Sequence, residues 1–211
     1  MAGCPVAACR DASGAGRPLP VGAPGATLSG VEPPFLPHLL AAFEAANGRP
    51  LAQAATVSAA GRPEVRTVVL RALGADGAPS FATDARSAKM APLGAGGWLE
   101  LCLWRPDVGV QLRLLGRARV HRADDDRALT LWAALPLDTR ALFFSDPPGL
   151  PLRDEATAQP PTPAPDDPPP AAFAVVRLAP ERFDRLELGP PLRRRTWTLE
   201  GTFWRSAEVV P

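Results

Sequence analysis

The stretch FATDARSAKM, residues 81–90, places Arg86, Ser87 and Lys89 close together after a short run that is typical of a strand. If a helix opens near Arg86, these side chains surround its N-terminus, whose free backbone amides favour an anion. A guanidinium, a hydroxyl and an ammonium group suit a phosphate monoester, because Arg can bind two oxygens at once. A capped and solvated helix start is the alternative, since Ser is a common cap residue.

Two neighbouring segments carry polar residues that could join this cluster. In VRTVVLR, strand alternation puts Arg66 and Val68 on one face and Thr67 and Val69 on the other. Arg66 is then either a solvated strand end or an anion ligand. Gln111, in VQLRLL, either faces solvent or reads the polar edge of a planar heterocycle, since its amide both donates and accepts hydrogen bonds.

The apolar pattern predicts the elements that hold these residues. Helical spacing predicts one helix over 35–47, ended by Asn47-Gly48, and a second over 123–135 with an acidic first turn, followed by a short helical piece. Short apolar runs separated by turn residues predict strands at 51–59, 64–73, 79–83, 98–104, 110–120, 173–178, 183–189, 194–200 and 203–209. This order predicts a mainly β fold, an antiparallel barrel or half-barrel with peripheral helices.

One domain accounts for most of the chain. Residues 1–31 carry Gly, Ala and Pro without periodicity, which predicts a flexible N-terminal arm, and residues 32–211 form the predicted domain. The Pro-rich run QPPTPAPDDPPP predicts a surface loop at about 156–171, because Pro cannot continue a helix or a central strand.

Composition argues against several classes of partner. With 23 basic and 22 acidic residues the net charge is +1, so no global field draws the chain to nucleic acid or to anionic membranes. The run of three arginines at 193–195 is too local to change that expectation. No apolar run approaches the ~20 residues of a membrane span. The N-terminus lacks the pattern of a secretory signal, so a cytoplasmic protein is expected. Neither the three cysteines nor the two histidines have the spacing of a metal site.

Three ordered motifs, RTVVLR, FATDARSAK and VQLRLLGRARV, resemble the FMN-binding core of the pyridoxamine 5'-phosphate oxidase-like superfamily. The later segments LWAALPLDTRALFFSDPPGLP and FDRLELGPPLRRRTW resemble a branch of it without a characterised substrate, so the similarity covers residues 35–211. It implies an FMN-binding split β-barrel that forms a homodimer with the cofactor at the interface.

Roles for single residues follow from this resemblance. Arg66 and Lys89 are expected to hold the FMN phosphate. The residues expected to assist them at the phosphate are Arg86, Ser87 and Thr83.

The isoalloxazine ring is expected to lie against Thr67, Val68 and Val69. Gln111 is expected to approach its polar edge across the dimer, and Arg195 to reach the flavin region from the C-terminal segment. Arg193 and Arg194 are candidate partners for an anionic substrate group.

The C-terminal segment departs from the vitamin-converting oxidases, because PLRRR lacks the His of their Arg-x-His substrate motif. The resemblance therefore implies an FMN-dependent oxidoreductase with a substrate other than pyridoxamine 5'-phosphate. Two alternatives stay open: a non-catalytic flavin-binding or sensor protein, and a split barrel that holds another cofactor, such as haem or a deazaflavin.

Overall fold

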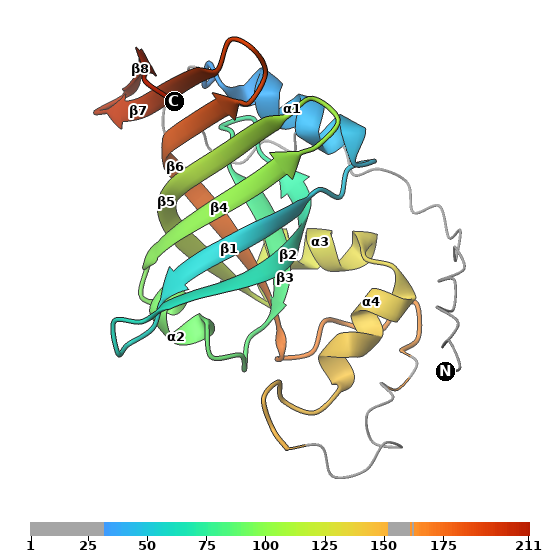
Figure 1. The fold of residues 1–211 in the computed structure, drawn as a ribbon. Coiled ribbons are helices and arrows are strands. Elements are labelled where there is room, and N and C mark those ends of the chain that lie inside the picture. The colour runs from blue at the N-terminus through green and yellow to red at the C-terminus, as the bar shows by residue number, and fades with distance from the viewer. Residues whose placement is uncertain (1–31, 152–160, 162) are drawn as a thin grey trace, which may run out of the picture.

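A barrel of antiparallel strands forms the body of the molecule in the computed structural model (Figure 1). The structure describes residues 32–151, 161 and 163–211. The strands are β1 (Leu51–Val57), β2 (Pro63–Leu73), β3 (Pro79–Asp84), β4 (Trp98–Arg105), β5 (Val110–Arg122), β6 (Phe173–Glu187), β7 (Arg193–Glu200) and β8 (Phe203–Val209). The helices are α1 (Leu36–Ala45), α2 (Met90–Gly94), α3 (Asp126–Ala134), α4 (Leu137–Ala141) and the short 3₁₀ turn η1 (Leu142–Phe144). The predicted mainly β, antiparallel fold with peripheral helices is confirmed.

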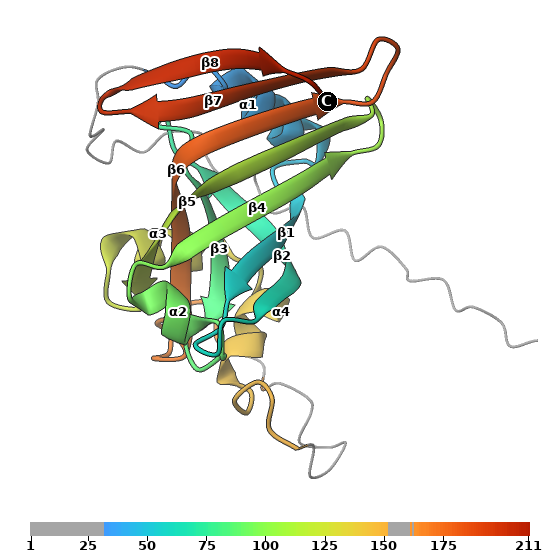
Figure 2. The same cartoon turned by 60° about the vertical axis from the view of Figure 1, so that its left-hand side comes forward.

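Strand β6 closes the barrel. The strands follow one another in the order β3, β2, β1, β4, β5 and β6, and β3 pairs back onto β6. Residues 173–177 of β6 pair with β3, whereas residues 182–187 pair with β7. Strand β5 pairs with β6 along its other edge. The first part of β6 therefore belongs to the barrel, and the last part leads into the β7–β8 hairpin, which extends the sheet (Figure 2).

The prediction of two strands, at 173–178 and 183–189, is wrong, because β6 runs through both. Its ladder with β5 shifts by one residue, which leaves Glu181 as the extra residue of a β-bulge. The bulge accommodates Pro180, which has no amide hydrogen to donate to the ladder. Pro180 thus makes this strand irregular without ending it.

Gly116 of β5 makes this bulge feasible. A Cβ atom at this position would lie 1.9 Å from the carbonyl oxygen of Ala179, so a larger residue would force the two strands apart. The bulge also changes which residues of β6 face inward. Leu178 points into the barrel before it and Phe183 joins the same core after it, while Asp184 lies on the outer face.

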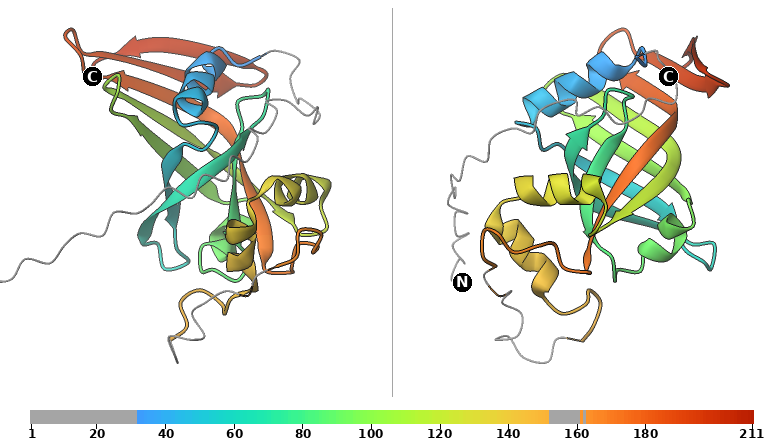
Figure 3. Two further views of the ribbon diagram at one scale, coloured as in Figure 1. Left: turned by 90° about the vertical axis from the view of Figure 1, so that its right-hand side faces the viewer. Right: turned by 180° about the vertical axis from the view of Figure 1, so that it is seen from behind.

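Helix α1 covers the end of the barrel beside the β7–β8 hairpin (Figures 1 and 3). Its N-cap residue Phe35 stacks on Phe183 with ring centroids 4.6 Å apart and meets Trp204 edge-on at 4.7 Å. The helix ends near Asn47, which has a positive φ, as its Asn-Gly signal predicts. This packing joins the N-terminal helix to the last two strands.

Helix α3 packs on the outside of β6 near its start, and Phe143 of η1 belongs to the same apolar cluster (Figure 3). Asp125 caps α3 by accepting a hydrogen bond from the amide of Arg127 at 2.8 Å, in agreement with the predicted acidic start. Trp132 of α3 meets Phe173 edge-on at 5.0 Å. None of the helices among the described residues is long and apolar enough to span a membrane.

The described part of the Pro-rich segment has no regular secondary structure, as its composition predicts. Buried Arg140 donates to the carbonyl of Pro165 at 2.7 Å, and the indole of Trp132 donates to the carbonyl of Asp167 at 2.8 Å. These bonds attach the segment to α3 and α4. The predicted N-terminal arm, 1–31, lies outside the described residues, as do 152–160 and 162.

Candidate functional site

Arg66 lies at the end of the barrel where strand β1 ends. Its Nη1 donates to the hydroxyl of Thr56 at 2.6 Å and to the carbonyl of Ala54 at 3.3 Å, and its Nη2 pairs with Glu64 at 2.9 Å. Thr56 is only 3 % exposed. Sequence reasoning did not identify Thr56. Its cross-strand partner in the β1–β2 hairpin is Glu64, two residues before Arg66, and this neighbourhood was a usable signal. Thr56 and Glu64 together fix the guanidinium at the barrel end.

Lys89 is the second cation at this end. Its ammonium group donates to the hydroxyl of Ser87 at 2.8 Å. Burial lowers the pKa of Lys89, the positive charge of Arg66 lowers it further, and Asp84 partly offsets both effects. Two like charges that repel one another in a half-buried place form a site that a dianionic phosphate would complement. The structure thus brings together Arg66, Ser87 and Lys89.

The helix expected near Arg86 begins later than the sequence predicts. Residues 85–89 form turns, and α2 starts at Met90 with Lys89 as its N-cap. Asp84 causes this delay, because its carboxylate accepts the amide of Arg86 at 2.7 Å and its carbonyl accepts the hydroxyl of Ser87 at 2.7 Å. The expectation that these side chains surround a helix N-terminus is therefore wrong, and the site depends on the side chains themselves.

Arg86 is engaged elsewhere. Its Nη2 pairs with Asp84 at 2.7 Å and also donates to the carbonyl of Ser145 at 2.8 Å, while its Nε donates to Asp84 at 3.0 Å. These bonds tie the turn after β3 to the segment after η1. The structure therefore gives Arg86 a structural contact and shows no contact that joins it to Arg66 or Lys89.

The residues expected beside the flavin ring divide between the two faces of β2. Thr67 and Val69 are on the outer face, whereas Val68 packs in the barrel core, so only the backbone of Val68 is accessible to a ligand. The β2–β3 ladder begins at Leu70, whose amide donates to the β1 side. Backbone hydrogen-bonding groups alternate between the two edges of a strand, so the amide and carbonyl of Thr67 point toward the β3 edge of β2, ahead of the residue where that ladder begins.

Thr83 is buried on β3, opposite Ala174 of β6, and directly precedes the Asp84 turn. Its position agrees with an expected place near the phosphate end, although its side chain has little exposure there. Thr83 can affect a ligand at this end mainly by setting the direction in which the chain enters the Asp84 turn.

Gln111 lies at the opposite end of the barrel. It pairs with Trp104, the end of β4 remote from α2, and with Leu186 of β6. Arg194 of β7 pairs with Leu186 in turn, so these four residues form one row on the outer face. A single chain therefore does not bring Gln111 to Arg66 and Lys89.

The three arginines of β7 do not share a face. Arg193 and Arg195 lie on the side of Trp197 and α1, where Arg195 pairs with Glu208 at 2.5 Å. Arg194 lies on the outer face with Gln111. Within one chain Arg195 and Gln111 therefore lie on different faces, and Arg194 lies nearer to Gln111.

Asp184 is a site residue that the sequence analysis missed. It is 3 % exposed, and its carboxylate pairs with Arg194 at 2.7 Å, Arg113 at 3.2 Å and Arg182 at 3.4 Å. Burial alone would raise its pKa, but the hydrogen bond and charge of Arg194, with the charges of the other two arginines, hold the pKa below its usual range. An acidic residue in a strand between arginines was the available signal.

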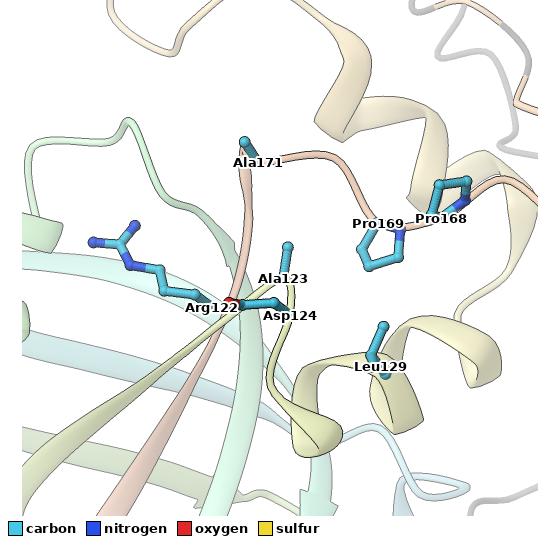
Figure 4. A pocket seen from close by; sticks show the side chains of 7 residues that line it. All are labelled: Arg122, Ala123, Asp124, Leu129, Pro168, Pro169 and Ala171. Carbon is cyan, nitrogen blue, oxygen red and sulfur yellow. The ribbon is translucent and has the colours of Figure 1, made fainter.

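An open depression of about 500 Å³ between the end of β5, α3 and the Pro-rich segment gathers none of the predicted residues. Figure 4 shows the guanidinium of Arg122 directed away from Leu129, Pro168 and Pro169. Convergent polar groups, which mark most ligand sites, are missing from it. Among the described residues no group of His, Cys, Asp and Glu side chains could hold a metal ion.

Comparison with known proteins agrees with the fold and with the resemblance in the motifs. Residues 32–122 match the family described as pyridoxamine 5'-phosphate oxidase, FMN-binding domain. A pyridoxine/pyridoxamine 5'-phosphate oxidase of Arabidopsis thaliana is 31% identical over 143 residues, which are 64% of this chain and 72% of the plant protein.

Two of the solved structures that share the fold illustrate the likeness. A pyridoxamine 5'-phosphate oxidase-related, FMN-binding protein of Nostoc punctiforme has a TM-score of 0.76 and 28% identity, over 84% of this chain and 98% of that one. PhzG of Burkholderia lata, solved with tetrahydrophenazine-1-carboxylic acid, has a TM-score of 0.72 and 22% identity, over 86% of this chain and 94% of that one. The chain belongs to the pyridoxamine 5'-phosphate oxidase family with an FMN-binding domain.

Proposed function

We propose that this protein binds FMN and acts as a homodimeric FMN-dependent oxidoreductase. The observation that carries the proposal is the pair of cations Arg66 and Lys89 at one end of the barrel, in a family whose domain is described as FMN-binding. The Ser87 hydroxyl, which accepts a hydrogen bond from Lys89, adds a polar group beside the pair. Arg66, Ser87 and Lys89 hold the phosphate. Thr67 and Val69 offer the outer face of β2 to the ring.

The bound flavin supplies electron or hydride transfer, while the protein supplies orientation and electrostatics. Arg66 is held by Thr56 and Glu64 before any ligand arrives, so little side-chain freedom is lost when the phosphate binds. Lys89 is half-buried, which strengthens its attraction to a dianion relative to a solvated lysine. The substrate differs from pyridoxamine 5'-phosphate, in keeping with the missing His of the C-terminal motif.

A second copy of the chain completes the site. Gln111 and the Arg66–Lys89 pair lie at opposite ends of one barrel, so a ligand can meet both only between two molecules. The outer face also carries exposed apolar side chains, the kind of surface that marks an interface. They are Leu51, Val57, Val65, Trp98 and Trp104.

Lys89→Met should weaken FMN binding about tenfold or more, because a hydrogen bond to a charged group is worth about 1.5–3 kcal/mol. Riboflavin, which lacks the phosphate, should bind the variant as it binds the wild type. Arg66→Lys should act in the same direction and still fill the place beside Thr56. Quenching of flavin fluorescence measures each affinity.

Arg86→Ala is the matched control, since its guanidinium is bonded to Asp84 and Ser145. Its FMN affinity should stay within about threefold of the wild type. An equal loss of FMN and riboflavin binding in Lys89→Met, or a larger loss in Arg86→Ala, would show that the phosphate is held elsewhere.

FMN affinity should also fall at alkaline pH. Lys89 attracts the phosphate only while its amine is protonated. The phosphate itself stays dianionic above its second pKa of about 6. Because the pKa of Lys89 is lowered, the loss should begin below the pH at which an exposed lysine deprotonates. Lys89→Arg keeps its charge and should remove this loss, with riboflavin titrated in parallel to correct for ionisation of the ring. A wild-type profile that matches the arginine variant contradicts the role of Lys89.

Turnover separates an oxidoreductase from a passive binder. The FMN-loaded protein should bleach when NADH or NADPH is added without oxygen, and its yellow colour should return in air. Absorbance in the visible range follows both steps. A loaded protein that stays yellow with both donors supports a sensor or carrier, and a wild type that takes up haem or a deazaflavin in preference to FMN supports an exchange of cofactor.

Val65→Glu should separate the dimer. Val65 is 64 % exposed on the outer face, and a charge buried there without a partner should raise the dimer dissociation constant at least about a hundredfold. Leu150→Glu, at a residue 60 % exposed near α4, is the control and should leave the dimer intact. Sedimentation velocity reports the state of each. A wild type that is monomeric with FMN bound refutes the shared site.

A further inference from the structure

Asp184 and Arg194 form an ion pair on the outer face in which two nitrogens meet two oxygens. Nε of Arg194 lies 3.1 Å from one carboxylate oxygen, and its Nη2 lies 2.7 Å from the other. Two parallel bonds of this kind fix the plane of the guanidinium as well as its position. Asp184 is 3 % exposed, and its backbone pairs with Arg113 of β5. The carboxylate is therefore held in place and fixes the position of the guanidinium.

The pair leaves binding capacity on Arg194. A guanidinium has five N–H donors, and Asp184 uses Nε–H and one Nη2–H. No described residue accepts a hydrogen bond from Nη1. Arg194 is also partly exposed, so these remaining donors can reach a ligand.

The surroundings of Asp184 carry more positive than negative charge. Three guanidinium groups, those of Arg113, Arg182 and Arg194, face this one carboxylate, and Glu100 adds a second acid at 3.4 Å from Arg113. These side chains, except that of Arg194, also line a small cavity of about 40 Å³. The Nε of Arg113 is the atom that lies 3.4 Å from Glu100, and although it is buried it makes no hydrogen bond among the described residues. The surplus charge favours an anion beside the cluster.

The row of cross-strand pairs sets the distance from this cluster to Gln111. Leu186 lies between Gln111 and Arg194 on neighbouring strands. Strands are about 4.8 Å apart, so the two polar side chains start roughly 10 Å from each other. Leu186 offers an apolar surface between them. A flat molecule of one or two rings spans that distance.

We propose that Asp184 is a positioning residue that holds Arg194 beside Gln111, where Arg194 binds the anionic group of an aromatic substrate. This inference rests on the proposed function, in which Gln111 meets the edge of the flavin ring. It selects Arg194 over Arg193, which lies on the opposite face of β7. The anion is a carboxylate or a phosphate carried by the ring system.

Two pairs of probes distinguish these sources of negative charge. Benzoate is compared with benzamide, and pyridoxamine 5'-phosphate with pyridoxamine, so each pair differs at its anionic group. Every compound is titrated into the FMN-loaded protein, and the shift of the flavin absorbance bands gives its dissociation constant. The wild type should bind at least one anionic member about tenfold more tightly than its uncharged counterpart.

Arg194→Gln and Asp184→Asn should each abolish that preference while keeping the affinity for the uncharged counterpart. Arg193→Gln is the matched control for the first variant. Arg182→Gln is the control for the second, because it removes another partner of Asp184 and leaves Arg194 in place. Both controls should retain the preference. If Asp184→Asn fails to fold, Asp184→Glu is used, and the longer acid should shift the affinity for the anion alone.

The outcomes separate this inference from the proposed function. A wild type that takes up no FMN overturns both. A loaded wild type that treats charged and uncharged probes alike overturns only the role of Arg194, as does a preference lost equally in Arg193→Gln. A preference lost in Arg194→Gln but kept in every folded Asp184 variant assigns the binding to Arg194 and refutes the positioning role.

Discussion

The pairing of one edge of β6 with two different strands governs this structure. Its first residues close the barrel against β3, and its last residues carry β7 and β8 beyond the barrel. The bulge at Glu181 falls between these two pairings, and it is possible because Gly116 has no side chain. Without that close approach the β7–β8 hairpin would lose its place beside α1. Phe35 would then lose Trp204 as a packing partner.

Unbalanced charge marks two separate places on the barrel. Where β1 ends, Arg66 and Lys89 repel each other, and only Glu64 and Asp84 offset their charges. On the outer face of β5 and β6, three guanidinium groups gather on Asp184. Groups of this kind are unfavourable for folding unless something compensates them, and they are common where a protein binds an opposite charge. The near-neutral composition conceals this arrangement, because acids elsewhere in the chain offset the total.

Local patterns in the sequence were sufficient for the fold class and for most elements. Alternation in VRTVVLR correctly put Val68 and Thr67 on opposite faces of β2, and the acidic start of α3 supplied its cap. The delayed start of α2 could not be read in this way, because the competing bonds of Asp84 are as local as those of a helix. The continuity of β6 between 178 and 183 was missed, since the glycine that permits the bulge lies on another strand.

The site was harder to predict than the fold for a related reason. Ser87 and Lys89 are near neighbours in sequence, so their meeting was foreseeable. Asp184 meets Arg113 only through the β5–β6 register, which no local pattern reveals. The separation of Gln111 from Lys89 likewise becomes visible only when the strands are laid out in order.

The bulge in β6 also determines which residue numbers face the inside of the barrel. Inward-facing positions are even-numbered before it, as at Leu178, and odd-numbered after it, as at Phe183. If β6 kept all its residues but lost the bulge, even numbering would continue, so Asp184 would turn toward the aromatic cluster under α1 and Phe183 toward solvent. Loss of one residue between Leu178 and Phe183 would instead remove the extra residue and keep Phe183 inside. The identity of Gly116 on β5 and the number of residues on β6 are therefore linked, because a chain with a larger residue at position 116 keeps both faces of β6 only if this stretch is one residue shorter.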